Sequence, residues 1–223
     1  MKDLKAVKGT YYINRLIAEG EHEHQDFKFA ISDARKIARS ISAFANNGGG
    51  RLLIGVKDNG AIAGVRNEED IYVVEQAAQM YCRPEQHIEV TAFRVEGGAV
   101  VFRVDIARSE VRPVEVKEEK GRWKAYFRVA DENIAAPEFM TRSWRRRCVD
   151  TPLVMSISGA ESLLLEALEA NGPMTPEELS RHGRLTREAT LELIARLHAL
   201  DLIDFTYSAS GFRIVAAEAP DEP

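Results

Sequence analysis

The sequence predicts an α+β fold, with a mixed β-sheet and packed helices followed by a small winged-helix domain. Three observations lead to this class. The apolar run at residues 52–56 is typical of a central strand, and helical apolar stripes lie at 33–46 and 68–82 between strand-like segments. At the C-terminal end, three helical segments precede two short strands, which is the order of a winged helix.

The first part of the chain supplies the sheet and its helices. A short helix is expected at residues 11–19, and the second helix begins at Ser32 or Asp33, either of which can cap it. The glycine run 48–50 ends that helix, and Asp58 to Gly60 is a hairpin turn signal. The strands are expected at residues 25–29, 52–56, 62–65, 87–95, 99–106, 114–116 and 123–129.

The second part of the chain is smaller. Helices are expected at residues 160–170, from Thr175 onward and at 186–200, and strands at 202–207 and 211–215. We therefore expect a domain at residues 1–150, a winged-helix-like domain at 151–216 and a disordered tail at 217–223. An arginine-rich helix beginning at Pro137 is assigned to the first domain.

Composition restricts the class of protein. The chain has 45% hydrophobic residues but no run of 18 apolar residues, so no membrane span is expected. It starts without the apolar segment of a secretory signal, and its two cysteines have no metal or redox spacing. These features predict a cytoplasmic protein. No dinucleotide fingerprint or Ser-His-Asp order indicates a metabolic enzyme.

Charge is divided unequally along the chain. Residues 1–150 contain 25 Lys and Arg against 23 Asp and Glu, whereas residues 151–223 contain 5 against 12. Binding of a polyanion requires local positive charge, so any such surface is expected on the first part.

Three carboxylates are the first candidates for chemistry. Glu21 and Asp26 surround the start of one strand, and Asp58 follows the end of another. If these strands pair, the acids can converge at one sheet edge and hold Mg²⁺ or Mn²⁺, while Lys28 neutralises a phosphate. The ordinary interpretation is that they are exposed acids at turns and strand ends.

Several motifs follow one another along the chain: Glu21 with Asp26-Phe27-Lys28, then AFANNGG at residues 43–49, then LIGVKDNGAIAG at 53–64. In this order and spacing they resemble the Schlafen-type AlbA-2 domain. The resemblance covers about residues 15–140 and implies a DNA-binding module. Eukaryotic Schlafen relatives are metal-dependent ribonucleases that cut tRNA and rRNA, which places a catalytic and metal-ligating role on Glu21, Asp26 and Asp58.

This chain departs from the family pattern at two positions. Asp26 stands where relatives usually have Glu, which shortens a metal ligand by one methylene, and Lys57 stands where they often have Asp. Schlafen nucleases also pair two such lobes as a clamp. Because this chain has one lobe, a clamp would require a homodimer.

Two basic clusters are candidates for binding nucleic acid. Arg35, Lys36 and Arg39 are expected on the exposed side of the second helix. The second cluster, in the arginine-rich helix, consists of Arg142, Arg145, Arg146 and Arg147. Arginine binds phosphate and stacks on bases, although both clusters could instead be solvated or paired with acids, including those of a partner subunit.

Three other patterns give weaker indications of a functional site. The glycine turn follows a helix and precedes a strand, the reverse of a phosphate-binding loop, so it is interpreted as structural and no ATP site is expected. His22 and His24 could join a Zn²⁺ site but lack further ligands. The helix at residues 186–200 would read DNA in a winged helix, but its acidic module favours dimerisation or protein contact.

The sequence thus favours a nucleic-acid-binding protein that needs no cofactor, with DNA binding and transcription regulation as its expected role. The alternative is a metal-dependent endoribonuclease acting on structured RNA such as tRNA. A weaker alternative is a protein-interaction adaptor.

Overall fold

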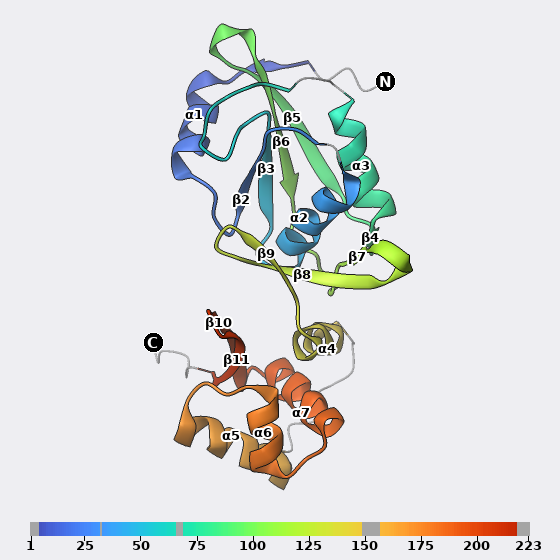
Figure 1. Ribbon diagram of the computed structural model, residues 1–223, viewed down its shortest axis with the longest axis vertical. Coiled ribbons are helices and arrows are strands. Elements are labelled where there is room, and N and C mark those ends of the chain that lie inside the picture. The colour runs from blue at the N-terminus through green and yellow to red at the C-terminus, as the bar shows by residue number, and fades with distance from the viewer. Residues whose placement is uncertain (1–4, 32, 66–68, 149–156, 218–223) are drawn as a thin grey trace. The chain divides into compact units, whose positions relative to one another are not determined.

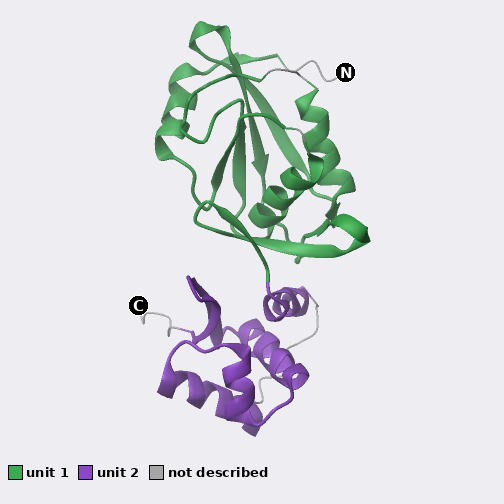
Figure 2. Ribbon diagram, in the orientation of Figure 1, with its two compact units in different colours: residues 1–136 green, residues 137–223 purple. Residues whose placement is uncertain are grey.

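The computed structural model describes residues 5–31, 33–65, 69–148 and 157–217. It divides into two compact units, residues 1–136 and 137–223, which Figure 2 distinguishes by colour. Ser32 and, apart from Ala217, the tail predicted at 217–223 lie outside the described residues. Among the described residues, no helix is long and apolar enough to cross a membrane.

Unit 1 is built on a five-stranded mixed sheet (Figure 1). The strand order is β1-β5-β6-β3-β2, with β1 Val7–Lys8, β2 Gln25–Lys28, β3 Gly50–Ile54, β5 Ile88–Arg94 and β6 Val100–Ile106. β3 pairs with β6 in antiparallel fashion but with β2 in parallel, which places Asp26 opposite Leu52. The strand predicted at residues 62–65 is reduced to a single bridge between Val56 and Ile62.

Helices cover both faces of this sheet. The helices are α1 Thr10–Glu19, α2 Ala34–Asn46 and α3 Asp70–Met80. Because side chains alternate along β3, Leu52 and Ile54 pack with α2 and α3, whereas Leu53 packs with α1. Figure 1 shows this arrangement, with α1 on the side opposite α2 and α3. The side chain of Asp33 caps α2 by accepting a hydrogen bond from the Arg35 amide.

A second, four-stranded sheet packs against α2. Its order is β4-β7-β8-β9, with β4 Cys82–Arg83, β7 Glu115–Lys117, β8 Trp123–Val129 and β9 Glu132–Ala135. Buried Asn46 at the end of α2 connects them: its Nδ2 donates to the carbonyls of Val114 and Tyr126 at 2.9 Å each, and its Oδ1 accepts from the Val114 amide at 2.7 Å. These bonds fix the β7–β8 hairpin relative to α2.

Unit 2 contains four helices and one hairpin among its described residues. They are α4 Glu138–Arg147, α5 Gly159–Asn171, α6 Pro176–Gly183, α7 Arg187–Ala199, β10 Ile203–Ser208 and β11 Gly211–Ala216. Capping boxes formed by Ser158 with Glu161 and by Thr175 with Glu178 begin α5 and α6. The order from α5 to β11 is the one that the sequence predicts for a winged-helix module.

The units divide 14 residues before the boundary predicted at residue 150. The reason is that α4, assigned by the sequence to the first domain, packs against α7 of unit 2. Without α4, residues 1–136 hold 21 Lys and Arg and 21 Asp and Glu. Attraction of unit 1 for a polyanion therefore depends on how these charges are distributed over its surface.

Candidate functional site

Two of the three predicted carboxylates lie together at the start of β2. Asp26 is 3% exposed, and its Oδ2 lies 2.7 Å from Lys28 Nζ and accepts a hydrogen bond from Ser40 Oγ at 3.2 Å. Its Oδ1 lies 3.6 Å from the guanidinium of Arg128, which is itself buried. Glu21 Oε1 accepts from the Phe27 amide at 2.8 Å. Cations and hydroxyls of the protein thus already surround Asp26.

The pKa values of these two acids move in opposite directions. Burial, the hydrogen bond to Asp26 and the negative charge of Asp26 together raise the pKa of Glu21 to about 7. Burial alone would raise the pKa of Asp26, but the hydrogen bond from Glu21 and the charges of Lys28 and Arg128 hold it below its usual value. Near neutral pH, Glu21 is therefore close to half protonated beside an ionised Asp26.

Asp58 does not join this pair. It lies on an exposed turn six residues along the chain from Leu52, the residue opposite Asp26. Glu21 precedes β2 and Asp58 follows β3, and the two strands are parallel. Among the described residues no group of three His, Cys, Asp or Glu side chains that could hold a metal is found, so the structure does not show the predicted convergence of the three acids.

A divalent metal does not fit this arrangement. Among the described residues, no three His, Cys, Asp or Glu side chains are grouped so as to hold a metal ion. The oxygens of Asp26 are also directed at Lys28, Ser40 and Arg128 rather than at an open position. The residues that could donate to Mg²⁺ or Mn²⁺ are therefore not assembled as ligands here.

The predicted basic residues of α2 differ in their surroundings. Arg39 binds Glu118 through two hydrogen bonds, of 2.7 and 2.6 Å, and Arg35 lies 3.9 Å from Glu119. Lys36 is exposed, and no carboxylate among the described residues pairs with it. The hydrogen bonds from Arg39 are the main cause that lowers the pKa of Glu118 to about 2.

Two depressions adjoin Glu118, and the sequence did not indicate them. One, of about 620 Å³, lies beside β8 and is lined by Arg39, Glu118, Glu119, Arg122, Trp123, Lys124 and Tyr126. The other, of about 230 Å³, is lined by Arg35, Met80, Tyr81, Lys117, Glu118, Lys120 and Gly121. We call their six cationic side chains the hairpin surface: Arg35, Arg39, Lys117, Lys120, Arg122 and Lys124.

Most cations of the hairpin surface are not neutralised. Lys117, Lys120, Arg122 and Lys124 are exposed and form no ion pair with a carboxylate of the described residues, although the charge of Lys124 helps to lower the pKa of Glu118. The two acids that line the depressions, Glu118 and Glu119, face Arg39 and Arg35 instead. The surface therefore keeps a local excess of positive charge within a unit whose counted charges balance.

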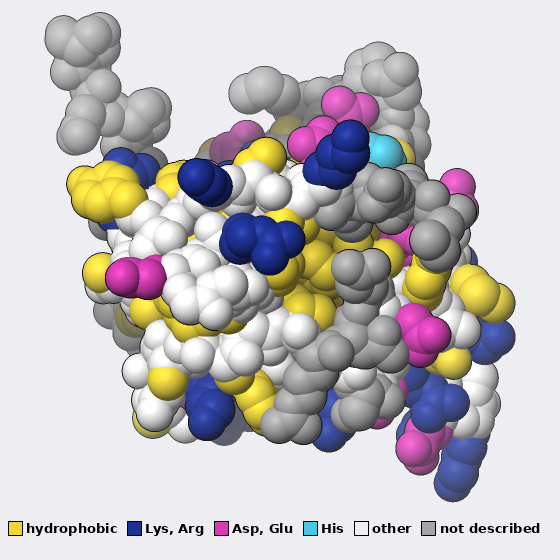
Figure 3. Space-filling view, turned by 90° about the horizontal axis from the view of Figure 1, so that it is seen from above, with side chains coloured by type: hydrophobic (Ala, Val, Ile, Leu, Met, Phe, Trp, Pro, Cys, Tyr) yellow, Lys and Arg dark blue, Asp and Glu magenta, His cyan; other side chains and the backbone are white. Residues whose placement is uncertain are grey.

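Figure 3 shows how charge is distributed over one face of the molecule. On the face shown in Figure 3, Lys and Arg side chains stand at separate places with hydrophobic side chains between them. No continuous basic strip crosses the described part of that face. The hairpin surface differs because its six cations line two neighbouring depressions that share Glu118.

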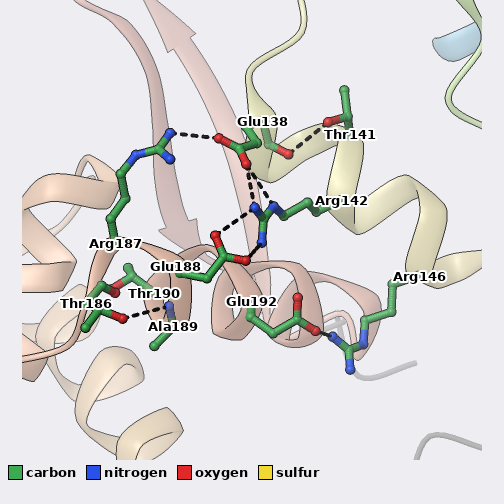
Figure 4. A network of polar contacts seen from close by, with 10 residues as sticks. All are labelled: Glu138, Thr141, Arg142, Arg146, Thr186, Arg187, Glu188, Ala189, Thr190 and Glu192. Atoms are coloured by element: carbon green, nitrogen blue, oxygen red, sulfur yellow. Dashed lines mark hydrogen bonds and ion pairs between the residues drawn. The ribbon is translucent and has the colours of Figure 1, made fainter.

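The predicted arginines of α4 are largely paired with acids of their own unit (Figure 4). Arg142 contacts Glu138 and donates to Glu188 at 2.6 and 2.9 Å, and Arg146 contacts Glu192. Arg147 contacts Asp201 and also donates a hydrogen bond to the backbone carbonyl of His198. These contacts correspond to the alternative that the sequence left open, with the acids in the same chain.

Arg145 also lies on this helix and has contacts of its own. Arg187 of α7 binds the second oxygen of Glu138 at 2.8 Å, which extends the network. Of the residues that a reading helix would offer, Thr190 is 1% exposed and Arg196 lies 3.0 Å from Glu161. The packed and paired side of α7 is therefore not a free nucleic-acid surface.

The remaining sequence candidates have structural roles. His24 Nδ1 contacts the carbonyl of Gly49 at 2.8 Å, and His22 Nδ1 accepts from the His24 amide. The glycine turn is structural as predicted: Gly49 has φ +81°, and a Cβ there would lie 2.9 Å from the Ile106 carbonyl oxygen. Buried Gln25 was not singled out, although its Nε2 binds the carbonyls of Leu16 and Gly20 and holds β2 to α1.

Comparison with known proteins gives a family. The model of the family described as Schlafen, AlbA_2 matches residues 21–137. No protein with curated annotation matches the sequence. Among solved structures, the DIP2311 protein from Corynebacterium diphtheriae is similar, with 19% identity and a TM-score of 0.45. The match covers 86% of this chain but only 34% of that protein. The family model spans more than half of the residues of the present chain, which therefore belongs to the Schlafen AlbA_2 family.

Proposed function

We propose that unit 1 binds nucleic acid through the hairpin surface. The observation that carries the proposal is the contrast in pairing: Lys117, Lys120, Arg122 and Lys124 have no carboxylate partner among the described residues, whereas Arg142 and Arg146 are bound to acids. Unpaired cations can release condensed counterions from a phosphate backbone, and paired ones contribute less. Membership of the Schlafen AlbA_2 family supports the same class of partner.

This proposal moves the predicted interface. Arg35 and Arg39 remain part of it, with Lys36 beside them on α2, and residues of the β7–β8 hairpin take the place of the α4 arginines. Unit 2 would then serve assembly or protein contact, and a DNA-binding regulatory role would depend on partners of that unit. A homodimer, which would present two hairpin surfaces to one nucleic acid, belongs to the same proposal.

The test is a mobility shift with labelled tRNA and with duplex DNA, using the full chain and a K120Q/R122Q variant. Both substituted side chains are exposed, so the fold should tolerate the change. We expect a salt-sensitive shift with the unmutated protein that weakens about tenfold in the variant at low salt. A shift of equal strength in both proteins would refute this interface, and no shift with either nucleic acid would leave the adaptor function.

A second candidate function is endoribonuclease activity, and one observation favours it. Glu21, with a pKa of about 7, lies beside ionised Asp26 and partly exposed Lys28. A carboxyl group that is half protonated near neutral pH can take or give a proton, and an ammonium can neutralise a phosphate. Since the acids are not assembled as metal ligands, we derive no step through a metal.

Cleavage of the same labelled tRNA tests this second candidate. Incubations with Mn²⁺ and with EDTA are compared for the unmutated protein, E21Q and D58N. Loss of cleavage in E21Q but not in D58N would support proton transfer by Glu21. Loss in D58N together with a need for Mn²⁺ would favour the three-acid metal site, and intact tRNA throughout would exclude both for this substrate.

A further inference from the structure

The larger depression beside β8 combines three kinds of side chain. Trp123 and Tyr126 supply aromatic rings, Arg122 and Lys124 supply cations without carboxylate partners, and Glu118 supplies a carboxylate. We propose that this depression binds one unstacked nucleotide of a single strand. The inference rests on the proposed nucleic-acid binding and specifies its ligand.

The size and the aromatic lining fit one nucleotide. A volume of about 620 Å³ lies in the range of sites that enclose small ligands. Trp123 is half-buried, and the guanidinium of Arg83 lies 4.4 Å from the centroid of its ring. Arg83 is in turn held by Glu115 at 2.8 Å, so the orientation of the indole is fixed from one side. A base within a duplex is already stacked on its neighbours, whereas a base in a single strand is free to contact such a ring.

The charged groups of the depression are arranged before any ligand binds. Arg39 donates to both oxygens of Glu118, and the Tyr126 hydroxyl donates to Oε1 at 2.6 Å. With three hydrogen bonds accepted, one lone-pair position remains on Oε2 of Glu118. Because the pKa of Glu118 is held at about 2, it is ionised at neutral pH and can accept from a base N–H group.

The phosphate side of the nucleotide would face cations that precede and follow Trp123. Arg122 and Lys124 are both exposed, and Lys124 Nζ lies 6.0 Å from the ring centroid of Tyr126. Arg122 directly precedes β8, Lys124 follows Trp123 within it, and all three residues line the same depression. The backbone phosphates can therefore run along β8 while the base turns toward the aromatic ring.

Tryptophan fluorescence provides the first measurement. The chain has two tryptophans, Trp123 and Trp144, and Trp144 is 4% exposed in unit 2. The full-length protein is titrated with a 12-nucleotide single strand and with a duplex of the same length. We expect saturable quenching by the single strand, and its loss in W123F would assign the signal to Trp123.

Affinity for fluorescently labelled versions of the same two oligonucleotides is then compared in variants. W123L should weaken binding of the single strand about tenfold and leave duplex binding within about twofold, and W123F should retain part of the affinity. Y72L is the matched control, because Tyr72 is an exposed aromatic residue of unit 1 that lines neither depression. Circular dichroism and thermal melting confirm that each variant is folded.

The outcomes separate this inference from the function on which it rests. Selective loss of single-strand binding in W123L supports the nucleotide site. Binding of both oligonucleotides that is unaffected by W123L and W123F overturns the nucleotide site but keeps the proposed function. Absence of binding to either oligonucleotide by the unmutated protein overturns both.

Discussion

The substitution D26N tests the buried charge cluster that fixes the start of β2. Asp26 and Arg128 are 3% and 1% exposed, and the carboxylate also contacts Lys28 and Ser40. Asparagine keeps the size of the side chain but removes its charge. Lys28 is 30% exposed and can turn to water, whereas Arg128 cannot.

The expected loss of stability follows from what remains around Arg128. Removing one partner of a buried ion pair costs about 3–5 kcal/mol. Arg128 also donates to the carbonyls of His22 and Gln25 and to Asn133 Oδ1, at 3.1–3.3 Å. These bonds stay in the variant, and the ion pair itself is long at 3.6 Å. We therefore expect a loss near the lower limit, about 3 kcal/mol in the free energy of unfolding.

Urea unfolding followed by circular dichroism at pH 7 measures this loss. The control is D105N, which breaks the 2.7 Å ion pair of Asp105 with Arg103. These side chains are 33% and 26% exposed, so the loss in the free energy of unfolding should be about 1 kcal/mol or less. A loss in D26N no larger than that in D105N would refute the reasoning.

The pH dependence of the D26N loss is a second check on it. The pKa of Asp26 in the folded protein lies below its usual 3.8, so its charge stabilises the fold above that pH. Because Asp26 also raises the pKa of Glu21 to about 7, the difference in stability between the unmutated protein and D26N should be constant only at pH values above that pKa, where both acids are ionised. It should shrink as the pH falls below about 4.

Three further predictions concern other parts of the molecule. Because the pKa of Glu21 is raised from 4.5 to about 7, the folded state holds a proton between these pH values that the unfolded chain has lost. The free energy of unfolding should therefore fall as pH rises from 4.5 to about 7, and E21Q should reduce this pH dependence in urea unfolding. N46A removes the partner of the Val114 amide and the Asn46 donor to the Tyr126 carbonyl, whereas the Val114 carbonyl keeps its bond from Ser42 Oγ; the variant should cost about 3 kcal/mol in the same assay, and an unchanged midpoint would contradict the bridging role. In G49A the new Cβ would lie 2.9 Å from the Ile106 carbonyl oxygen, on a residue with positive φ. The melting temperature should fall by several degrees, at about 2–4 °C per kcal/mol lost, and an unchanged melting temperature would argue against a strained turn.

Local patterns predicted much of unit 1. The apolar run at residues 52–56 overlaps β3, which begins and ends two residues earlier and has neighbours on both sides, and the helical stripe at 33–46 is α2 with Asp33 as its cap. The glycine turn could be interpreted from Asn and Gly alone, because the requirement for positive φ is a property of the backbone. The two-residue strands β1 and β4 were missed, since two residues carry no periodicity.

The candidate site was less predictable, because it depends on partners that are distant in sequence. Periodicity cannot distinguish parallel from antiparallel pairing of β2 and β3, so it could not predict how Glu21, Asp26 and Asp58 lie relative to one another. Glu188, which binds Arg142, and Glu192, which binds Arg146, each lie 46 residues further along the chain. In the hairpin, residues 117–124 hold four cations beside Glu118 and Glu119, and only the pairing of Glu118 with Arg39 shows which cations have no ion pair.

The most direct test of the nucleic-acid interface is the dependence of binding affinity on salt concentration. Fluorescence anisotropy with labelled duplex DNA, or with tRNA if that binds more tightly, gives the slope of log K against log[salt] for the unmutated protein, K120Q/R122Q and R142Q/R146Q. Both variants remove two positive charges, one pair from the hairpin surface and one from the paired helix α4. The hairpin surface predicts that K120Q/R122Q reduces the slope by about 2 on duplex DNA, while R142Q/R146Q leaves it unchanged. A reduced slope in R142Q/R146Q with an unchanged slope in K120Q/R122Q would contradict it and return the interface to α4.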